Sequence, residues 1–231
     1  MFIQIFVMNI TPITLNYFFG VNSYLIETES GFYILDTGFH KKRIQLEKEL
    51  QSTKCKPGNL KLIILTHGHT DHAGNAEYLR DKYGVKIAMH KGDTRMVETG
   101  DMFIDAQGGL FFRLIVSLMK LLGLSDCEKF TPDIYLDDDQ DLSPYGLNAN
   151  VIHTPGHSKG SISIMTAEGD LFCGDILGNT KNPEKTTLVD DPDQLNASVE
   201  HIKTLDTIRV YPGHVNAFRM DQFARVSDSN L

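Results

Sequence analysis

Residues 60–72 read Leu60-Lys61-Leu62-Ile63-Ile64-Leu65-Thr66-His67-Gly68-His69-Thr70-Asp71-His72, and this stretch decides how the rest of the chain is interpreted. Its apolar first half predicts a buried strand. Its second half places four side chains of the metal-ligand type, three imidazoles and one carboxylate, within six residues. These groups suit zinc, iron or manganese. Because four ligands from one short loop cannot close around a single ion without strain, the motif predicts two metal sites.

The sequence on both sides of this motif alternates between strand patterns and helical patterns. Strands are expected at 21–27, 32–35, 60–65, 85–89, 149–153, 161–165, 171–173 and 208–211, and helices at 41–51, 76–83 and 194–205. This order predicts an α/β fold in two halves of similar element order. The apolar start, residues 1–10, lacks the basic residues of a signal peptide and is expected to be a first strand.

An insertion-like stretch separates the two halves, at about residues 100–146. Its middle, residues 110–124, is apolar at eleven of fifteen positions. At ~1.5 Å per residue this segment predicts a helix about 22 Å long, too short to cross a bilayer. Its apolar surface requires a cover, for which a lid over a substrate with an apolar portion or a contact in a homodimer is favoured over a membrane surface.

Three further residues of the ligand type follow apolar strands in the same way. His157 comes after a Pro-Gly pair, Asp175 after Gly174, and His214 after another Pro-Gly pair. In α/β proteins, sites form on the loops beyond one edge of the sheet. We therefore expect one metal-binding cluster with seven ligands: His67, His69, Asp71, His72, His157, Asp175 and His214.

This ligand pattern resembles the metallo-β-lactamase superfamily, in order from Asp36 to His214. The resemblance implies a four-layer αββα sandwich, here a single domain over 1–231, with a two-metal site between the sheets. It implies that Asp36, in Leu35-Asp36-Thr37-Gly38, supports the ligand loops from outside the coordination sphere. It also implies a first metal on His67, His69 and His157, a second on Asp71, His72 and His214, and Asp175 as the bridge between them.

The resemblance and the chemistry of the motif together predict a metal-dependent hydrolase. Its cofactors are expected to be two divalent ions, zinc first, with manganese or iron as alternatives. A hydroxide bridging the metals is the expected nucleophile, and Asp71 the expected proton acceptor.

Asp175 is the residue that separates the branches of the superfamily. True β-lactamases of this fold lack a bridging aspartate there, whereas the glyoxalase II, thioesterase and lactonase branches keep it. The resemblance therefore favours hydrolysis of a small-molecule ester, thioester or lactone. Only 17 residues follow His214, too few for the helical glutathione-binding domain of glyoxalase II.

Two other functions stay open on the same scaffold: a mononuclear iron dioxygenase of sulfur compounds, and a phosphodiesterase or nuclease. The net charge of −8 disfavours a surface that binds nucleic acid. The three cysteines lie at no metal-binding or redox spacing, which is typical of reduced thiols in a cytoplasmic protein. No apolar run is long enough for a transmembrane segment.

Several residues near the motif have a structural interpretation as well as a functional one. His90 and His153 each end a strand and are expected to serve as hydrogen-bonding partners rather than metal ligands. Cys173 is expected to be a small core side chain. Asn179 and Lys181, on the loop after Asp175, could contact a substrate carboxylate or carbonyl, or form ordinary polar surface.

Overall fold

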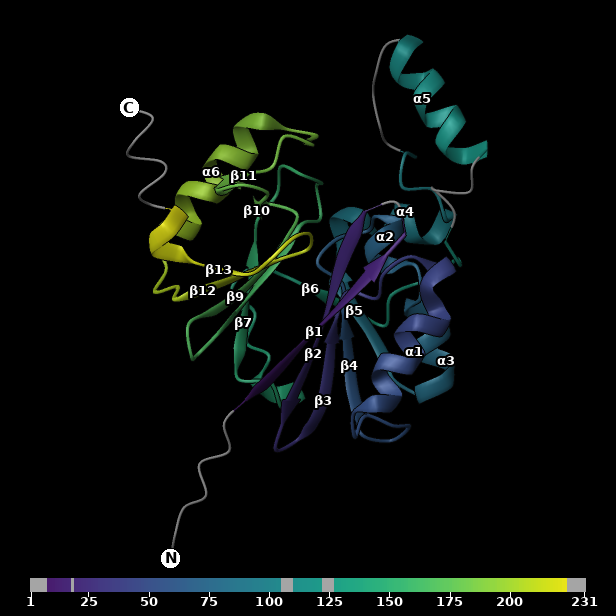
Figure 1. Ribbon diagram of the computed structural model, residues 1–231, viewed down its shortest axis with the longest axis vertical. Helices are drawn as coiled ribbons and strands as arrows, with labels where there is room; N and C mark the ends of the chain where they lie inside the picture. Colours follow the sequence, from purple (N-terminus) through teal and green to yellow (C-terminus); the bar gives the residue numbers. More distant parts are fainter. Residues whose placement is uncertain (1–7, 18, 105–109, 122–126, 224–231) are drawn as a thin grey trace, which may run out of the picture.

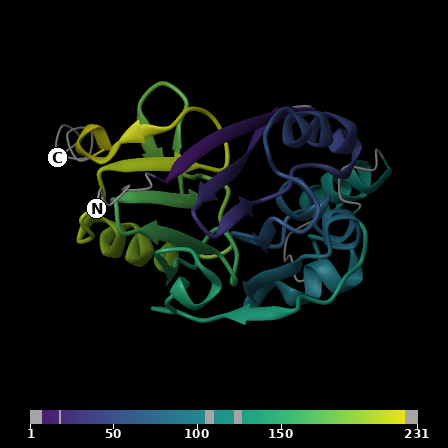
Figure 2. The ribbon, with the colours of Figure 1, turned by 90° about the horizontal axis from the view of Figure 1, so that it is seen from below.

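The computed structural model describes residues 8–17, 19–104, 110–121 and 127–223. Its strands form two sheets that pack face to face, and helices cover the outer face of each sheet (Figures 1 and 2). The predicted four-layer αββα sandwich is therefore confirmed. Of the strand expected at 1–10, residues 1–7 lie outside the described part of the chain.

The first sheet holds the N-terminal half and has six strands in sequence order. Its first three strands are antiparallel, and the pairs from β3 to β6 are parallel. The strands are β1 Asn9–Asn16, β2 Gly20–Thr28, β3 Gly31–Leu35, β4 Leu60–Ile64, β5 Lys86–His90 and β6 Ile134–Leu136. The helices of this half are α1 Arg43–Ser52, α2 Thr70–Ala73, α3 Ala76–Tyr83 and α4 Thr94–Thr99, with short 3₁₀ turns at His40–Lys42 and Lys91–Asp93.

The second sheet holds the C-terminal half, in the order β13-β12-β9-β8-β7. Its strands are β7 Ala149–His153, β8 Ile162–Thr166, β9 Asp170–Gly174, β12 Arg209–Pro212 and β13 Phe218–Arg219. A separate hairpin joins β10 Leu177–Asn179 to β11 Pro183–Lys185, and α6 Pro192–Lys203 covers the outer face. A 3₁₀ turn lies at Ser143–Tyr145.

The apolar run in residues 60–65 is explained by burial on both faces of β4. Ile63 packs into the outer cluster with α1 and α3. Leu62 and Ile64 point the other way, because successive side chains of a strand alternate. They join a cluster between the two sheets to which both halves contribute, including Tyr24, Ile26, Tyr33, Val151, Ile164, Phe172 and Tyr211. The core therefore fixes one sheet against the other.

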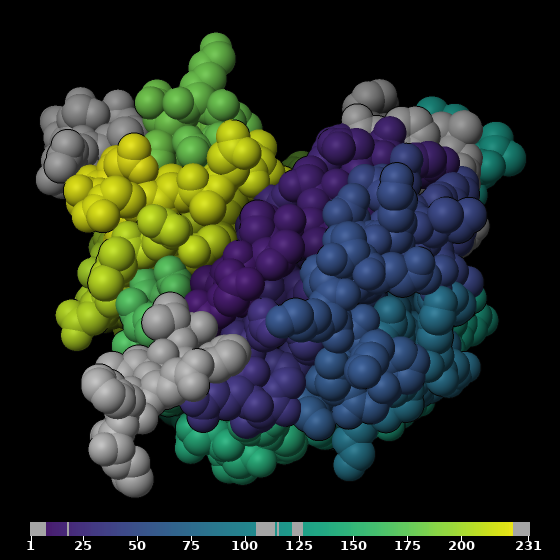
Figure 3. Space-filling view, turned by 60° about the horizontal axis from the view of Figure 1, so that its bottom comes forward, coloured from purple at the N-terminus to yellow at the C-terminus, as the bar shows by residue number. Residues whose placement is uncertain are grey.

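The first two strands also lie against the C-terminal half. In Figure 3, β1 and β2 form a purple band between the yellow C-terminal strands and the blue helical layer. The hydroxyl of Tyr24 in β2 donates to the carbonyl of Pro212 in β12 over 2.6 Å. Asn22, also in β2, donates from its backbone N–H to the carbonyl of Gly213 over 2.7 Å. These bonds fix the end of β12 relative to the first sheet.

The inserted stretch at about 100–146 is helical only in part. α5 Leu110–Leu121 confirms a helix in its middle and stands away from the sandwich (Figure 1). Leu114, Leu118 and Leu121 are exposed along it. Contrary to the expectation, residues 134–136 do not belong to an insertion, since β6 pairs in parallel with β5 and completes the first sheet. No helix among the described residues combines the length and apolar character that a bilayer crossing requires.

Gly156 sits where the loop after β7 meets α6. Its φ is +135°, and an added Cβ would come within 2.4 Å of the Leu195 backbone in that helix. Its carbonyl accepts hydrogen bonds from the backbone of Asp190 and of Asp191, the residue that caps α6. This close approach leaves no room for a side chain.

We expect Gly156→Ala to lower the free energy of unfolding by about 3 kcal/mol or more, because it combines a forbidden φ with a backbone clash. Gly84→Ala is the matched control, since Gly84 has φ +65° but open space around its Cα. That change is expected to cost only about 1 kcal/mol. Denaturant unfolding of both variants checks the difference, and equal costs would contradict the packing argument.

Candidate metal centre

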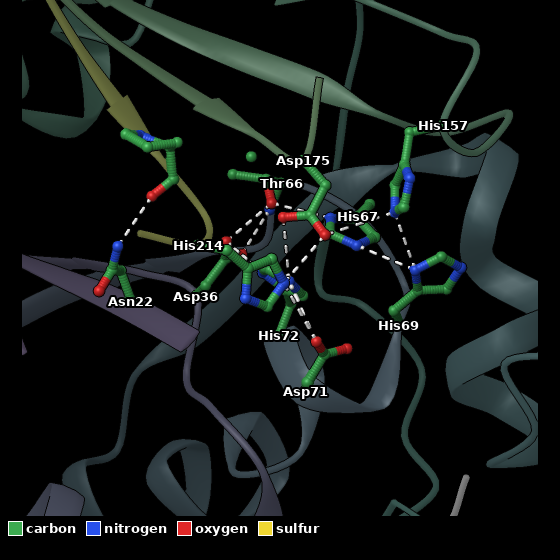
Figure 4. A network of polar contacts seen from close by, with 12 residues as sticks. Asn22, Asp36, Thr66, His67, His69, Asp71, His72, His157, Asp175 and His214 are labelled. Atoms are coloured by element: carbon green, nitrogen blue, oxygen red, sulfur yellow. Dashed lines mark hydrogen bonds and ion pairs between the residues drawn. The ribbon is translucent and has the colours of Figure 1, made fainter. Parts of the chain in front are cut away.

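The fold brings all seven predicted ligands to one place, between the two sheets. His67, His69, Asp71 and His72 lie on the loop after β4 and on α2, whereas His157, Asp175 and His214 follow β7, β9 and β12. Figure 4 shows their imidazoles and carboxylates pointing toward one another. They form three sets whose ligand atoms lie within 4.8 Å of one another: His67, His69 and His157; His67, His72 and Asp175; and Asp71, His72 and His214.

Three imidazoles converge in the first set. Nδ1 of His69 lies 3.1 Å from Nε2 of His67 and 3.0 Å from Nε2 of His157. Around a tetrahedral zinc ion with bonds of about 2.0–2.1 Å, neighbouring nitrogens lie roughly 3.3 Å apart. The observed spacing is close to that value. The three nitrogens are therefore arranged as ligands of one ion.

Asp175 lies between this set and the ligands of the second. Its Oδ2 is 3.6 Å from Nε2 of His157 and 3.1 Å from Nε2 of His214. Its Oδ1 is 3.3 Å from Nε2 of His72. Asp71 completes the second set, with Oδ2 at 3.4 Å from Nε2 of His214 and 3.6 Å from Nε2 of His72.

Two buried atoms at the centre of the cluster make no hydrogen bond. They are Nε2 of His72 and Oδ1 of Asp175, which face each other without hydrogen-bond geometry. A buried polar atom without a partner is costly, and such atoms need an explanation. Coordination to a divalent cation would satisfy both. The residues present therefore fit a divalent metal at this place.

In His72, His157 and His214, the hydrogen bond of one ring nitrogen decides which nitrogen faces the cluster. Nδ1 of His72 donates to Oδ2 of Asp36 over 2.8 Å. Nδ1 of His157 donates to the Leu188 carbonyl over 2.6 Å, and Nδ1 of His214 to the Gly20 carbonyl over 2.7 Å. A carbonyl or carboxylate only accepts, so the proton stays on Nδ1 and Nε2 faces the cluster.

Asp36 acts as the sequence predicted. Its Oδ1 accepts from the Thr66 backbone N–H, and its Oδ2 from the Thr66 hydroxyl as well as from His72. Thr66 in turn contacts Nδ1 of His67 over 3.0 Å. Asp36 has φ +57°, an uncommon conformation for a residue with a side chain. One carboxylate thus orients two ligands from outside the cluster.

The two ends of the cluster differ in charge. Burial, and then the neighbouring His72, holds the pKa of His67 well below its usual value. Burial and His157 lower the pKa of His69 to about 4. These two imidazoles are therefore neutral at physiological pH, which is the form that binds metal.

The other end carries negative charge. Burial acts to raise the pKa of Asp175, but His72 and His214 outweigh it and hold this pKa well below the usual value. The pKa of Asp71 is also lowered, against burial, by His72 and His214. Burial acts to lower the pKa of His214, but Asp175 and Asp71 outweigh burial and raise this pKa to about 10. Both carboxylates are therefore ionised and require positive charge beside them.

The sequence analysis missed Asp93, which joins two ligand loops. It is 1% exposed. Its Oδ2 accepts from the Gly68 N–H over 2.9 Å and from the Ser158 hydroxyl over 2.6 Å, and its Oδ1 accepts from the Gly160 N–H over 2.7 Å. Asp93 follows β5 at the sheet edge where the ligands lie, and this position could have identified it from the sequence.

Asn75 was missed as well, although it is fully buried beside α2. Its side-chain amide donates to the carbonyls of Thr37, Gly38 and Phe39. It thereby holds the loop that carries Asp36 against the helix that carries Asp71 and His72. No feature of the sequence around Asn75 distinguishes it from an ordinary helix-cap residue.

The residues given a structural interpretation lie outside the cluster. The rings of His90 and His153 stack on each other at 4.1 Å between centroids. Cys173 is buried, and burial raises the pKa of its thiol to about 12, so it is not a thiolate. Asn179 ends β10, and Lys181 is exposed in the β10–β11 turn.

Comparisons with known proteins agree with this geometry. Residues 16–214 match the family model of the metallo-beta-lactamase superfamily. A beta-lactamase-like protein 2 homolog from Drosophila melanogaster is 30% identical over 204 residues, or 85% of this chain and 59% of the relative. This chain therefore spans less than two thirds of that relative's length. Hydroxyacylglutathione hydrolase GloC from Haemophilus influenzae is 31% identical over 173 residues, 74% of this chain and 72% of the relative.

A solved structure extends the likeness to nearly the whole chain. TTHA1623, determined in a di-iron-bound form, superposes with a TM-score of 0.72 and 26% identity, covering 93% of this chain and 97% of its own. Members of the matched family are mostly metal-dependent hydrolases, and some are not hydrolytic. On the family model, the relatives and the arrangement of its ligand loops, this chain belongs to the metallo-beta-lactamase superfamily.

Proposed function

We propose that this chain is a binuclear metal-dependent hydrolase of a small-molecule ester, thioester or lactone. The observation that carries the proposal is the position of Asp175, whose Oδ2 lies within 3.6 Å of a histidine from each of two ligand sets. A carboxylate in that position can bridge two ions. His67, His69 and His157 would hold one ion, and Asp71, His72 and His214 the other.

Two divalent ions in this site supply a water of lowered pKa and polarise the substrate carbonyl. The chain's own groups supply the rest. Asp71 is ionised and 7% exposed, so the carboxylate oxygen that does not face His72 and His214 can accept a proton. The hydrogen bonds on Nδ1 of His72, His157 and His214 hold their rings in place while the substrate binds. The net reaction breaks the acyl–oxygen or acyl–sulfur bond and consumes one water.

We propose zinc as the metal and a thioester as the first substrate class to test. A relative bears the name hydroxyacylglutathione hydrolase, which supports a thioester, while the di-iron form of TTHA1623 keeps iron open. We also propose that the protein is cytoplasmic, because the buried Cys55 and Cys173 form no disulfide, which is usual in a reducing compartment.

We expect the purified protein to bind about two divalent metal ions per chain. His69→Ala and His214→Ala should each lose about one ion, because the two residues lie in different ligand sets. His201→Ala, on the exposed side of α6, is the control and should keep both. Mass-spectrometric metal analysis after dialysis measures this. One iron per chain, with oxygen uptake and no hydrolysis, would instead support the dioxygenase alternative.

Asp71→Asn should lower kcat for hydrolysis by ~10²-fold or more, because the amide cannot accept the proton. The metal content of the variant is measured alongside, so that a lost ion is not mistaken for a lost base. Asp206→Asn, at an exposed position, is the matched control. The role of Asp71 is refuted if turnover of aryl esters, thioesters and lactones stays at the wild-type rate in a variant with full metal content.

Asp93→Asn should weaken metal binding at the first ligand set by about 10- to 100-fold. An amide cannot accept all three hydrogen bonds that position the loops of His69 and His157. Titration against a chromophoric chelator, in a His214→Ala background that isolates the first set, measures this affinity. The same change in a His69→Ala background should leave the second set's affinity near its starting value. Equal weakening in both backgrounds would indicate a general structural role.

A further inference from the structure

Three exposed apolar side chains lie on loops that contact the metal-ligand cluster. They are Phe19 at 53% exposure, Leu188 at 74% and Val215 at 38%. Each belongs to a different segment, and none of these side chains takes part in the site described above. Exposed apolar side chains on both sides of a polar cluster are a candidate binding surface.

Phe19 is held against the cluster by a row of aromatic rings. Its ring meets that of His214 edge-on, with 5.2 Å between centroids. On its other side it meets Phe39 at 5.6 Å, and Phe39 meets Tyr17 at 5.4 Å. Phe39 is buried, so the row has a fixed base. Phe19 therefore has a defined position at the His214 end of the cluster, although half of its surface faces solvent.

Leu188 lies at the other end of the metal-ligand cluster, beside His157. Its carbonyl accepts the hydrogen bond from Nδ1 of His157. The flanking backbone is tied down too, because Thr186 donates to the Ile176 carbonyl and Asp190 to the Gly156 carbonyl. The backbone of Leu188 is thus fixed beside His157 while its side chain stays exposed.

Val215 follows His214 directly and has φ +61°, a conformation that β-branched residues avoid. The side-chain amide of Asn22 holds it there, donating to the Val215 carbonyl over 2.7 Å and to the Pro212 carbonyl over 3.1 Å. Figure 4 shows Asn22 beside the cluster. A strained conformation that is held by several bonds is typical of functional sites.

These residues define an apolar rim: Phe19 and Val215 at the His214 end, and Leu188 at the His157 end. Between the two ends lies Asp175, whose Oδ2 is within 3.6 Å of both histidines. A carbonyl that reacts beside Asp175 would therefore lie between segments that expose apolar side chains, with the Phe19 ring in contact with His214 at one end. We propose that the apolar rim binds the hydrocarbon part of the substrate's acyl group, so that the substrate class is a medium-chain acyl ester, thioester or lactone.

This inference rests on the proposed hydrolase function. The alternative is that the substrate carries an anionic group, which Lys181 would bind. The experiment compares kcat/KM for straight-chain acyl thioesters from acetyl to decanoyl, with one common thiol. Each methylene that reaches the rim should raise kcat/KM by about threefold. Phe19→Ala and Leu188→Ala should each lower the decanoyl-to-acetyl ratio about tenfold or more. Phe19→Leu should restore most of it, because it restores apolar area.

Ile44→Ala is the matched control, since Ile44 is 84% exposed on α1. It should leave the ratio unchanged. A second readout needs no turnover: binding of the corresponding carboxylic acids to the metal-loaded protein, by calorimetry, should tighten with chain length and weaken in Phe19→Ala.

The possible failures can be told apart. Turnover without dependence on chain length overturns the rim and leaves the hydrolase standing. A preference for anionic acyl groups that Lys181→Ala removes, and Phe19→Ala does not, also overturns the rim. Tighter binding of longer acids without hydrolysis of any ester, thioester or lactone supports the rim and overturns the hydrolase.

Discussion

The constraint on which this structure depends is the burial of two ionised carboxylates, Asp71 and Asp175, in one place. Charges in a protein interior are costly unless opposite charge or hydrogen bonds compensate them. Here the compensating groups are the imidazoles of His72 and His214, which contact both carboxylates. The cluster therefore needs positive charge to be stable, and divalent metal ions supply it in the most concentrated form.

The sandwich places the histidines and the two carboxylates side by side, because the carboxyl ends of strands from both sheets meet at the cluster. The cluster between the sheets fixes β4 against β9 and β12. His67 to His72 come from the first of these, and Asp175 and His214 from the other two. Hydrogen bonds of Asp36, Asn75 and Asp93 tie the loops of His67–His72 and His157 to neighbouring loops. Asn22 does the same for the loop of His214. The positions of the ligands thus follow from the packing of the two sheets.

Many of the strands, helices and ligand positions were predictable, because local sequence patterns determine them. The helix 76–83 was predicted at its actual bounds, since Gly84 takes the left-handed conformation that ends it. The strand 149–153 likewise matches β7, and the seven ligand-type residues follow apolar strands in a repeated manner. Asp93 and Asn75 were missed, because their partners, mostly backbone groups, lie 25 or more residues away along the chain, and no sequence spacing records them. The short strand β6 was missed because three residues carry no periodic signal.

Hydrogen bonds to backbone carbonyls allow the surroundings of such a site to vary while its ligand histidines keep their positions. His157 and His214 are oriented by backbone carbonyls, of Leu188 and Gly20. A backbone carbonyl is present whatever the side chain, so the residues around the rim can vary while the imidazoles keep their positions. Phe19 and Leu188 lie where side chains face solvent and backbone faces the ligands. Side chains that could select a substrate and backbone groups that orient the ligand histidines can therefore vary separately in the same loops, so the ligand motif identifies the family but not the substrate.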